Sequence, residues 1–340
     1  MKIKKQFDSK TVLLWITIIL FFALYSLGMI LYHERGFANL QNFLNLFISN
    51  AGLIVIGAGM TVVMITGGID ISVGSFVAMA CMMLASLIEN NGLNTASAMI
   101  IVLIVGLIFG FVQGLFIAYL DIQPFIMTLA GTFFARGMTA IISESMINIK
   151  DATFLALASH KIYFPFGGYL NKHGKLIVPY IYPTVVVALL TLVIIFWFLR
   201  YTKLGRNIYA IGGSEQSALL MGLDVKRTKL IAYSISGLCS GIGGILFCLN
   251  TCSGFVEQAK GFEMDAIASA VIGGTLLTGG VGNVFGTLFG VLINGTIQSF
   301  ITFQGTLSSW WVRISIAALL AFFIILQSIF AFITAKRKGL

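Results

Sequence analysis

The segment Tyr201–Lys229, with the sequence YTKLGRNIYAIGGSEQSALLMGLDVKRTK, is a polar stretch in an otherwise apolar chain. The 340 residues are 58% hydrophobic and 10% charged, and their mean hydropathy is +0.99. Soluble domains typically have about 25% charged residues, so most of this chain belongs in lipid. We therefore expect an all-α integral membrane protein in which residues 201–229 form a loop between two spans.

Ten apolar runs on the two sides of this loop come close to the roughly 20 residues that cross a bilayer as a helix. The first run has 22 residues and no small-residue cleavage site after it, so we expect a retained anchor rather than a signal peptide. About ten transmembrane helices in a single domain, residues 1–340, are predicted. The runs are Thr11–Tyr32, Phe43–Thr66, Ile71–Leu87, Thr95–Leu120, Phe125–Ile142, Tyr182–Leu199, Leu230–Asn250, Ala266–Thr278, Val284–Phe303 and Trp310–Thr334.

The distribution of Lys and Arg predicts the orientation, because these residues concentrate in cytoplasmic segments near span ends. If both termini and residues 201–229 are cytoplasmic, these segments hold 13 of the 21 basic residues. Residues 143–181 then form an extracytoplasmic loop. Topology accounts for the net charge of +9, so no nucleic-acid partner is expected. The 13 residues are Lys2, Lys4, Lys5, Lys10, Arg200, Lys203, Arg206, Lys226, Arg227, Lys229, Lys336, Arg337 and Lys338.

The four cysteines and three histidines show no metal-ligand spacing and no catalytic triad pattern. The chain also lacks the G-x-x-x-x-G-K-[ST] phosphate loop. We predict no metal site and no catalytic residues, and any ATP must be bound by another polypeptide.

Two segments repeat at a constant offset of 212 residues: AGMTVVMITGGIDISVGSF at 58–76 and AVIGGTLLTGGVGNVFGTL at 270–288. Each contains Thr-Gly-Gly, at 66–68 and 278–280. Because glycine pairs allow the chain to leave helical geometry, we expect broken or re-entrant helices in a parallel internal repeat. Non-helical backbone at membrane depth needs protein or a water-filled cavity to satisfy it. These turns either line such a cavity, pack against a partner, or are tight hairpins without a ligand.

Glycines recur every fourth residue in two further places, a spacing that lets helix backbones approach closely. We expect both sets to pack against neighbouring helices. They are Gly106, Gly110, Gly114 and Gly282, Gly286, Gly290.

Several charged residues lie within the apolar part of the chain. Asp70 either caps the following helix, where the helix dipole favours an anion, or takes part directly in gating. The same alternatives, capping or contact with a polar solute, hold for Glu263 and Asp265. Arg136 and Arg313 are expected near the outer surface, where their long side chains either extend to the interface or bind the solute.

Within the polar loop, residues 216–222 predict a short amphipathic helix ended by Gly222. A compact helix joined to spans on both sides can act as a lever. The basic residues beside it are otherwise explained as an anchor on the cytoplasmic side.

These features resemble the permease family of bacterial ABC sugar importers that serves ribose, xylose, arabinose, galactose and galactofuranose. The resemblance covers nearly the whole chain. Within the family, TLAGTFFARG at 128–137 and GTLSSWW at 305–311 look most like the galactofuranose permease. The motifs that carry the family resemblance are TGGIDISVGS at 66–75, PFIMTL at 124–129, GRNIYAIGG at 205–213, and EMDAIA at 263–268 followed by VIGGT at 271–275.

The resemblance implies a multi-pass permease in the bacterial inner membrane, with no cofactor of its own. Implied partners are membrane lipid, a second permease that is homologous or identical, a cytoplasmic ABC ATPase that binds ATP and Mg²⁺, and an extracytoplasmic sugar-binding protein. Residues 205–222 match the region that contacts the ATPase, although only Ala218 and Gly222 fit the family's E-A-A-x-x-x-G pattern. The implied coupling residues are Gly205, Arg206, Tyr209, Gly212, Gly213, Ala218 and Gly222.

The mechanism that follows is delivery of a sugar to an outer mouth formed by residues 143–181 and 251–265, and switching of access around the two Thr-Gly-Gly turns when residues 205–222 move. An ion-coupled secondary transporter is the alternative, with Asp70 as its one candidate buried acid, and no motif supports an intramembrane enzyme. The candidate translocation-path residues are Thr66, Gly67, Gly68, Asp70, Ser72, Thr128, Glu263, Asp265, Thr278, Gly279 and Gly280.

Overall fold

The computed structural model describes residues 9–170, 176–306, 308 and 310–337. Lys2, Lys4, Lys5, Lys172, Lys175 and Lys338, which entered the orientation prediction, lie outside these ranges, as do Leu307 and Ser309 of the 305–311 motif. The helices are α1 (Ser9–Leu31), α2 (Leu40–Ile65), α3 (Val73–Ala85), α4 (Thr95–Tyr119), α5 (Pro124–Ile142), α6 (Ala152–Ser159), α7 (Pro183–Tyr201), α8 (Lys203–Gly213), α9 (Glu215–Leu220), α10 (Val225–Thr251), α11 (Phe262–Ile272), α12 (Val284–Gln304) and α13 (Trp310–Arg337).

Short elements complete the fold. A 3-10 turn, His33–Arg35, follows α1, and a π-helical turn, Ser86–Asn90, extends α3. Within the described residues, three antiparallel pairs of two-residue strands join the connecting segments. The pairs are β1 (Ile147–Asn148) with β6 (Ser253–Gly254), β2 (Ile162–Tyr163) with β5 (Tyr180–Ile181), and β3 (Tyr169–Leu170) with β4 (Leu176–Ile177).

Nine helices in the described part of the chain are long and apolar enough to cross a membrane, which confirms the all-α membrane fold. The predicted eighth span, Ala266–Thr278, is different. Its helix, α11, has 11 residues, about 16 Å at 1.5 Å per residue, and therefore covers only about half of a bilayer. Gly273 and Gly274 follow it, and Gly274 has φ +90°, a conformation that ends the helix.

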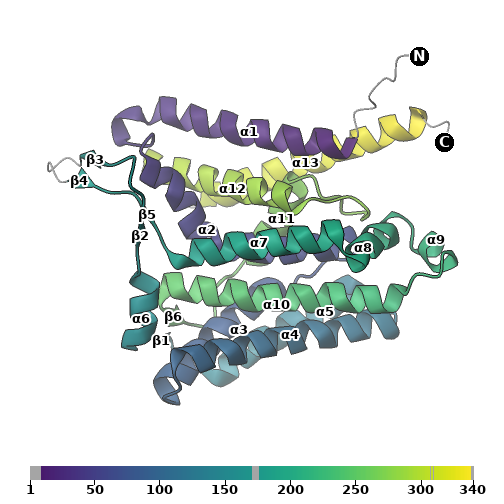
Figure 1. Cartoon of the computed structure of the whole chain (residues 1–340), viewed down its shortest axis with the longest axis horizontal. Helices are drawn as coiled ribbons and strands as arrows, with labels where there is room; N and C mark the ends of the chain where they lie inside the picture. The colour runs from purple at the N-terminus through teal and green to yellow at the C-terminus, as the bar shows by residue number, and fades with distance from the viewer. Residues whose placement is uncertain (1–8, 171–175, 307, 309, 338–340) are drawn as a thin grey trace.

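The two ends of the bundle differ in what they carry (Figure 1). One end holds α8 and α9, together with the first residues of α1 and the last residues of α13. The opposite end holds α6 and the three strand pairs. Residues 201–229 therefore lie at the opposite end of the molecule from residues 143–170 and 176–181, as two loops on different sides of a membrane must.

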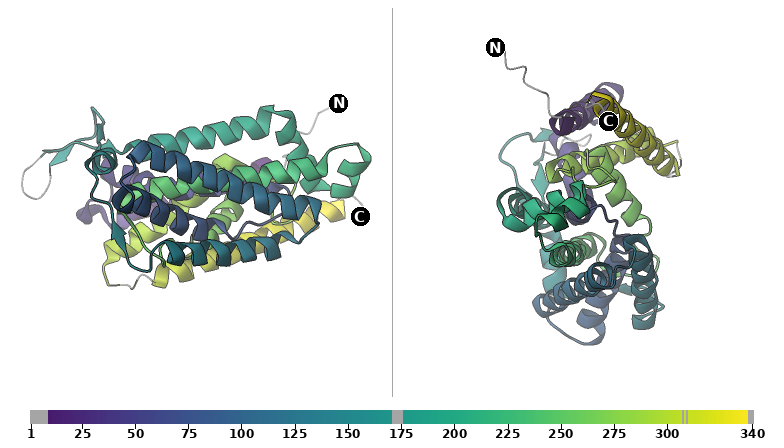
Figure 2. Two further views of the ribbon diagram at one scale, coloured as in Figure 1. Left: turned by 90° about the horizontal axis from the view of Figure 1, so that it is seen from below. Right: turned by 90° about the vertical axis from the view of Figure 1, so that its right-hand side faces the viewer.

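The bundle has a central helix and peripheral ones. In the most apolar 18-residue stretch of α2, 89% of the residues are buried, whereas in the corresponding stretch of α13 only 11% are buried. The end-on view in Figure 2 shows α1 and α13 at one margin and α4 and α5 at the other. The helices at the margins therefore face lipid or partners, and α2 supplies the core.

Glycines set the closest helix contacts, as predicted. Gly106, Gly110 and Gly114 of α4 pack on α10, where a β-carbon on Gly237 would lie 2.3 Å from the carbonyl oxygen of Gly106. In the second set, Gly290 of α12 packs against the backbone of Ser269 in α11, and Gly286 packs against Gly273, the residue after α11. Gly282 departs from the prediction, because it lies before α12 and faces the side chain of Ile65. Larger side chains at these positions would separate the helices.

The suspected repeat consists of two helix–turn–helix units. Residues 66–72 connect α2 to α3, and residues 273–283 connect α11 to α12. The second helices begin at Val73 and Val284, which are 211 positions apart and so match the offset of 212 to within one residue. The first helices differ, because α11 is much shorter than α2.

Candidate functional site

The polar loop folds into two short helices. The first of them, α8, is held at its N-terminal end. Its N-terminus is capped by the hydroxyl of Thr202, which accepts the N–H of Gly205 at 3.0 Å. Gly205 is buried, and a β-carbon on it would lie 2.4 Å from the carbonyl oxygen of Leu199. α8 therefore turns sharply off the end of α7 and stays packed against it.

The second helix, α9, presents an apolar tip. Ala218 is fully buried, and Gly222, with φ +75°, ends the helix as predicted. Leu219, Leu220 and Met221 are 57%, 85% and 66% exposed. The two residues that fit the family pattern thus position α9, and their apolar neighbours form its outer surface.

Gly212 of α8 meets both Thr-Gly-Gly turns at one junction of backbone against backbone. Across it, the N–H of Gly280 donates to the carbonyl of Ile65, the last residue of α2, at 2.8 Å. A β-carbon on Gly212 would lie 1.7 Å from that carbonyl oxygen and 2.4 Å from the nitrogen of Gly280. One on Gly279 would lie 2.8 Å from the nitrogen of Gly67. Three segments distant in sequence therefore meet where glycine is required by space.

Ile65, Gly67, Gly212, Gly279 and Gly280 form this junction. The other coupling candidates on α8 make different contacts. The hydroxyl of Tyr209 donates to the carbonyl of Gly282 at 2.9 Å, a second tie between α8 and the 273–283 segment. Burial raises the pKa of Tyr209, against a smaller opposing effect of Arg200, so the phenol remains a donor at neutral pH. Gly213 has open space around its α-carbon. Arg206 is exposed and lines a cavity.

A buried polar cluster lies at the start of α3. Asp70 is 1% exposed; its Oδ1 accepts the backbone N–H and the hydroxyl of Ser72 at 3.1 and 2.6 Å, and its Oδ2 accepts the hydroxyl of Ser236 at 2.7 Å. The amide of Gln113 donates to Ser72 at 3.0 Å. Asp70 precedes the N-cap residue, Ser72, and ties the 66–72 turn to α10 and, through Ser72, to α4.

Tyr233 completes this cluster. Its side chain is 1% exposed, and its buried hydroxyl has no hydrogen-bond partner among the described residues. A β-carbon on Gly68 would lie 2.2 Å from that hydroxyl oxygen. The glycine at 68 therefore makes room for the Tyr233 ring.

The threonines among the path candidates bond to nearby backbone. Thr128 of α5 donates its hydroxyl to Pro124 at 2.9 Å and to Ile69 of the first turn at 3.2 Å. Thr66 donates to Val63 at 2.6 Å. Thr278 is exposed. Thr128 therefore belongs with the Asp70 cluster, whereas Thr66 and Thr278 belong to the turns.

The acids of α11 lie in its first turn, after Gly261 as N-cap with φ +92°. No side chain hydrogen-bonds at that cap. The Oε2 atom of Glu263 is buried without a hydrogen-bond partner within the described ranges, and a β-carbon on Gly74 would lie 2.0 Å from it. The N-termini of α3 and α11 are therefore adjacent, with Asp265 in the same first turn.

Arg136 and Arg313 hold the segment that leads into α11, rather than simply extending to the interface. Arg136 donates to the carbonyls of Val256 and Gln258 at 2.5 and 2.8 Å. Arg313 donates to the carbonyl of Lys260 at 3.3 Å. Because β6 of this segment also pairs with β1, the two predicted parts of the outer mouth are joined.

Sequence reasoning missed three members of the Asp70 cluster: Gln113, Tyr233 and Ser236. Each is a polar side chain inside an apolar span, a signal that could have marked it. The bonds of Gln113 and Ser236 reach residues 41 and 166 positions away, and Tyr233 packs against Gly68, so these contacts could not be read from the sequence.

Comparisons with known proteins agree with one another. Residues 42–325 match the family model described as branched-chain amino acid transport system / permease component. The chain is 44% identical to the inner membrane ABC transporter permease protein YjfF of Escherichia coli, over 86% of this chain and 85% of that protein. It is 37% identical to the fructose import permease protein FruG of Bifidobacterium longum (83% and 81%) and 32% identical to the ribose import permease protein RbsC of Escherichia coli (84% and 85%). No solved structure matches it.

Proposed function

This chain belongs to the family of branched-chain amino acid transport system / permease components, and from that premise we propose that it is the membrane subunit of an ABC importer for a monosaccharide. Its fructose- and ribose-import relatives support a sugar as the solute. As a permease component, the chain is not the ATPase, and it is not an enzyme. The family assignment also favours ATP-driven import over the ion-coupled alternative.

We further propose a single domain, residues 1–340, with both termini and residues 201–229 in the cytoplasm and residues 143–181 outside. The arrangement of α8, α9 and the ends of α1 and α13 at one end of the bundle supports this orientation. A cysteine at Ser214, which is exposed beside α9, tests it. Because Cys81, Cys239 and Cys248 are buried, only Cys252 needs replacement by serine. Labelling of residue 214 by an impermeant reagent in intact spheroplasts would overturn the orientation.

The observation that carries the coupling proposal is the junction of Gly212 with both Thr-Gly-Gly turns. An ATPase that pulls on the exposed tip of α9 moves α8. Because α8 packs at Gly212 directly against the backbone of Ile65 and Gly280, these residues must move with it. Displacement of α8 is therefore transmitted at once to the end of α2 and to the segment that precedes α12. In this mechanism Gly205, Tyr209, Ala218 and Gly222 hold the two short helices in shape.

The Asp70 cluster is the proposed fixed point of the movement. Its bonds to Ser72 and Ser236 hold the start of α3 on α10, while the Gly67 end of the same turn contacts the junction. Motion of α8 would then bend residues 66–72, because their Gly67 end moves with the junction while their Ser72 end is held on α10. Thr128, Glu263 and Asp265 flank that region and are proposed to contact the passing sugar.

The proposed partners are an ABC ATPase that binds ATP and Mg²⁺, a second permease and an extracytoplasmic sugar-binding protein. The proposed solute is galactofuranose, on the motifs at 128–137 and 305–311. Membrane vesicles containing the whole complex, loaded with ATP, would be given radiolabelled galactofuranose, ribose or fructose with the cognate binding protein. Uptake of galactofuranose well above the other two supports the proposal, whereas preference for another sugar refutes the solute alone. Uptake that collapses with a protonophore at constant ATP refutes ABC-driven import.

A further inference from the structure

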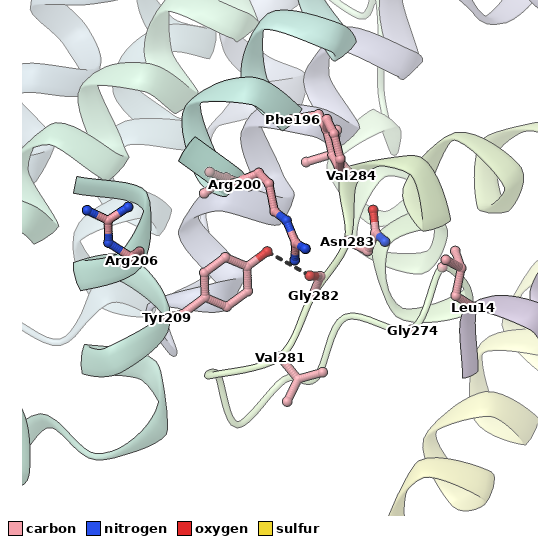
Figure 3. Close-up of a pocket in the computed structure, with 12 residues that line it drawn as sticks. Leu14, Phe196, Arg200, Arg206, Tyr209, Gly274, Val281, Gly282, Asn283 and Val284 are labelled. Atoms are coloured by element: carbon pink, nitrogen blue, oxygen red, sulfur yellow. Dashed lines mark hydrogen bonds between the residues drawn. The ribbon is translucent and has the colours of Figure 1, made fainter. Parts of the chain in front are cut away.

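A cavity of about 470 Å³ lies where α7 ends and α8 begins, beside the first turns of α1 and the segment before α12. Its lining is divided by chemistry. Arg200, Arg206, Tyr209 and Asn283 supply polar groups, and Leu14, Phe196, Leu199 and Val284 supply apolar ones. In Figure 3 the guanidinium of Arg200 lies beside the Tyr209–Gly282 hydrogen bond, and Arg206 lies on α8, on the far side of Tyr209 from Asn283.

The positive charge at this cavity is not neutralised within the described part of the chain. The ion pairs found there are Lys229–Glu215 and Lys260–Glu257, and neither involves Arg200 or Arg206. Arg206 makes one long bond, 3.4 Å, to the carbonyl of Tyr201. Two guanidinium groups without a carboxylate partner favour an anion, and guanidinium binds phosphate oxygens in paired hydrogen bonds.

The depth of the cavity matches the surface of the membrane. Arg200 is in the last turn of α7, a span that ends at Tyr201, and Leu14 is the second residue of the apolar span Leu13–Leu31. One turn deeper, Phe196 packs on Phe285 with ring centroids 4.7 Å apart. The arginines thus lie at headgroup level, and the wall below them is apolar.

From this division we propose that the cavity binds an anionic phospholipid, with its phosphodiester between Arg200 and Arg206 and an acyl chain along Leu14 and Phe196. Basic pockets between helices at the cytoplasmic surface are suited to such headgroups. Inorganic phosphate shares the charge but has no chain to cover the apolar wall, so lipid is the better fit. The bound lipid would bridge α1, α7, α8 and the 273–283 segment, and so hold α8 on the junction.

Native mass spectrometry of the delipidated complex, titrated with phosphatidylglycerol or phosphatidylcholine, tests the site. The wild type should bind phosphatidylglycerol preferentially, and Arg200→Gln should weaken that binding roughly tenfold, as loss of one charge-assisted interaction implies. Lys226→Gln is the matched control, because it removes the same charge from the start of α10, where the ammonium lies 5.8 Å from the centre of the Tyr119 ring. It should bind as the wild type does.

Equal binding by Arg200→Gln and the wild type would overturn the proposal, as would equal loss in Lys226→Gln. Displacement of phosphatidylglycerol by excess inorganic phosphate would identify the free ion as the ligand and overturn the lipid assignment. The assay contains neither ATP nor sugar, so its outcome is independent of whether the transport function is right.

Discussion

Replacing Gly212 with alanine tests the junction between α8 and the two turns. The new β-carbon would lie 1.7 Å from the Ile65 oxygen, where ordinary contact begins at 3.4 Å, so α8 must withdraw by about 1.7 Å or the turns must open. It would also press on Gly280, whose N–H bonds to Ile65 at 2.8 Å. Overpacking of this kind costs about 1–3 kcal/mol.

A cost of about 2 kcal/mol in the state that needs this contact corresponds to roughly 30-fold in its equilibrium constant. We therefore expect sugar-stimulated ATP hydrolysis and sugar uptake in proteoliposomes to fall at least tenfold. The amount of permease inserted in the membrane should not change, because the spans are untouched. Both rates are measured on the complete reconstituted complex.

Gly213→Ala is the matched control. It changes the next residue of the same helix in the same way, but a β-carbon there meets nothing within 4 Å. The gain in helix propensity, up to about 1 kcal/mol, is shared by both variants. We expect Gly213→Ala to transport within twofold of the wild type. If the two variants behave alike, the close contact at Gly212 does not transmit motion and the coupling argument is wrong.

Three further predictions address the cluster, the tip and the core. Asp70→Ala removes the carboxylate that accepts the hydroxyls of Ser72 and Ser236, so it should lower the free energy of unfolding by about 1–3 kcal/mol and reduce sugar uptake. Asp70→Asn keeps one acceptor oxygen and should lose less stability in a thermal unfolding assay. Equal losses of stability in the two variants would contradict the proposed bonding. Gly222→Pro cannot adopt φ +75° and should abolish binding of the ATPase in a pull-down while insertion continues; normal sugar-stimulated hydrolysis would remove α9 from the mechanism. Gly237→Val forces α4 from α10 and should lower the melting temperature by several degrees, whereas Gly137→Ala, with open space around it, should not.

Much of the fold could be predicted because its causes are local. A backbone in lipid must satisfy its own hydrogen bonds, so each long apolar run is a helix. The glycine pairs at 67–68 and 279–280 marked turns, and Gly222 marked the end of α9, since each depends on the conformations glycine alone adopts easily. α11 was predicted too long because apolar composition continues past Gly274, and only the positive φ there ends the helix.

The candidate site was harder to predict from the sequence than the fold, because its contacts join residues that lie far apart in the chain. Asp70 was identifiable as a rare buried acid, but its partner Ser236 is 166 positions away. Arg200 was counted only as a cytoplasmic charge, and nothing in its neighbourhood predicted a cavity shared with Asn283.

The sequence alone thus determined that this protein is a helical membrane permease with two glycine turns and a polar loop. The tertiary structure alone decided that Gly67, Gly212 and Gly279 meet. The physical reason is that a helix in lipid is apolar on every side, so its hydrophobic pattern does not record which neighbour it faces. That choice is made by the fit of backbone against backbone across the bundle.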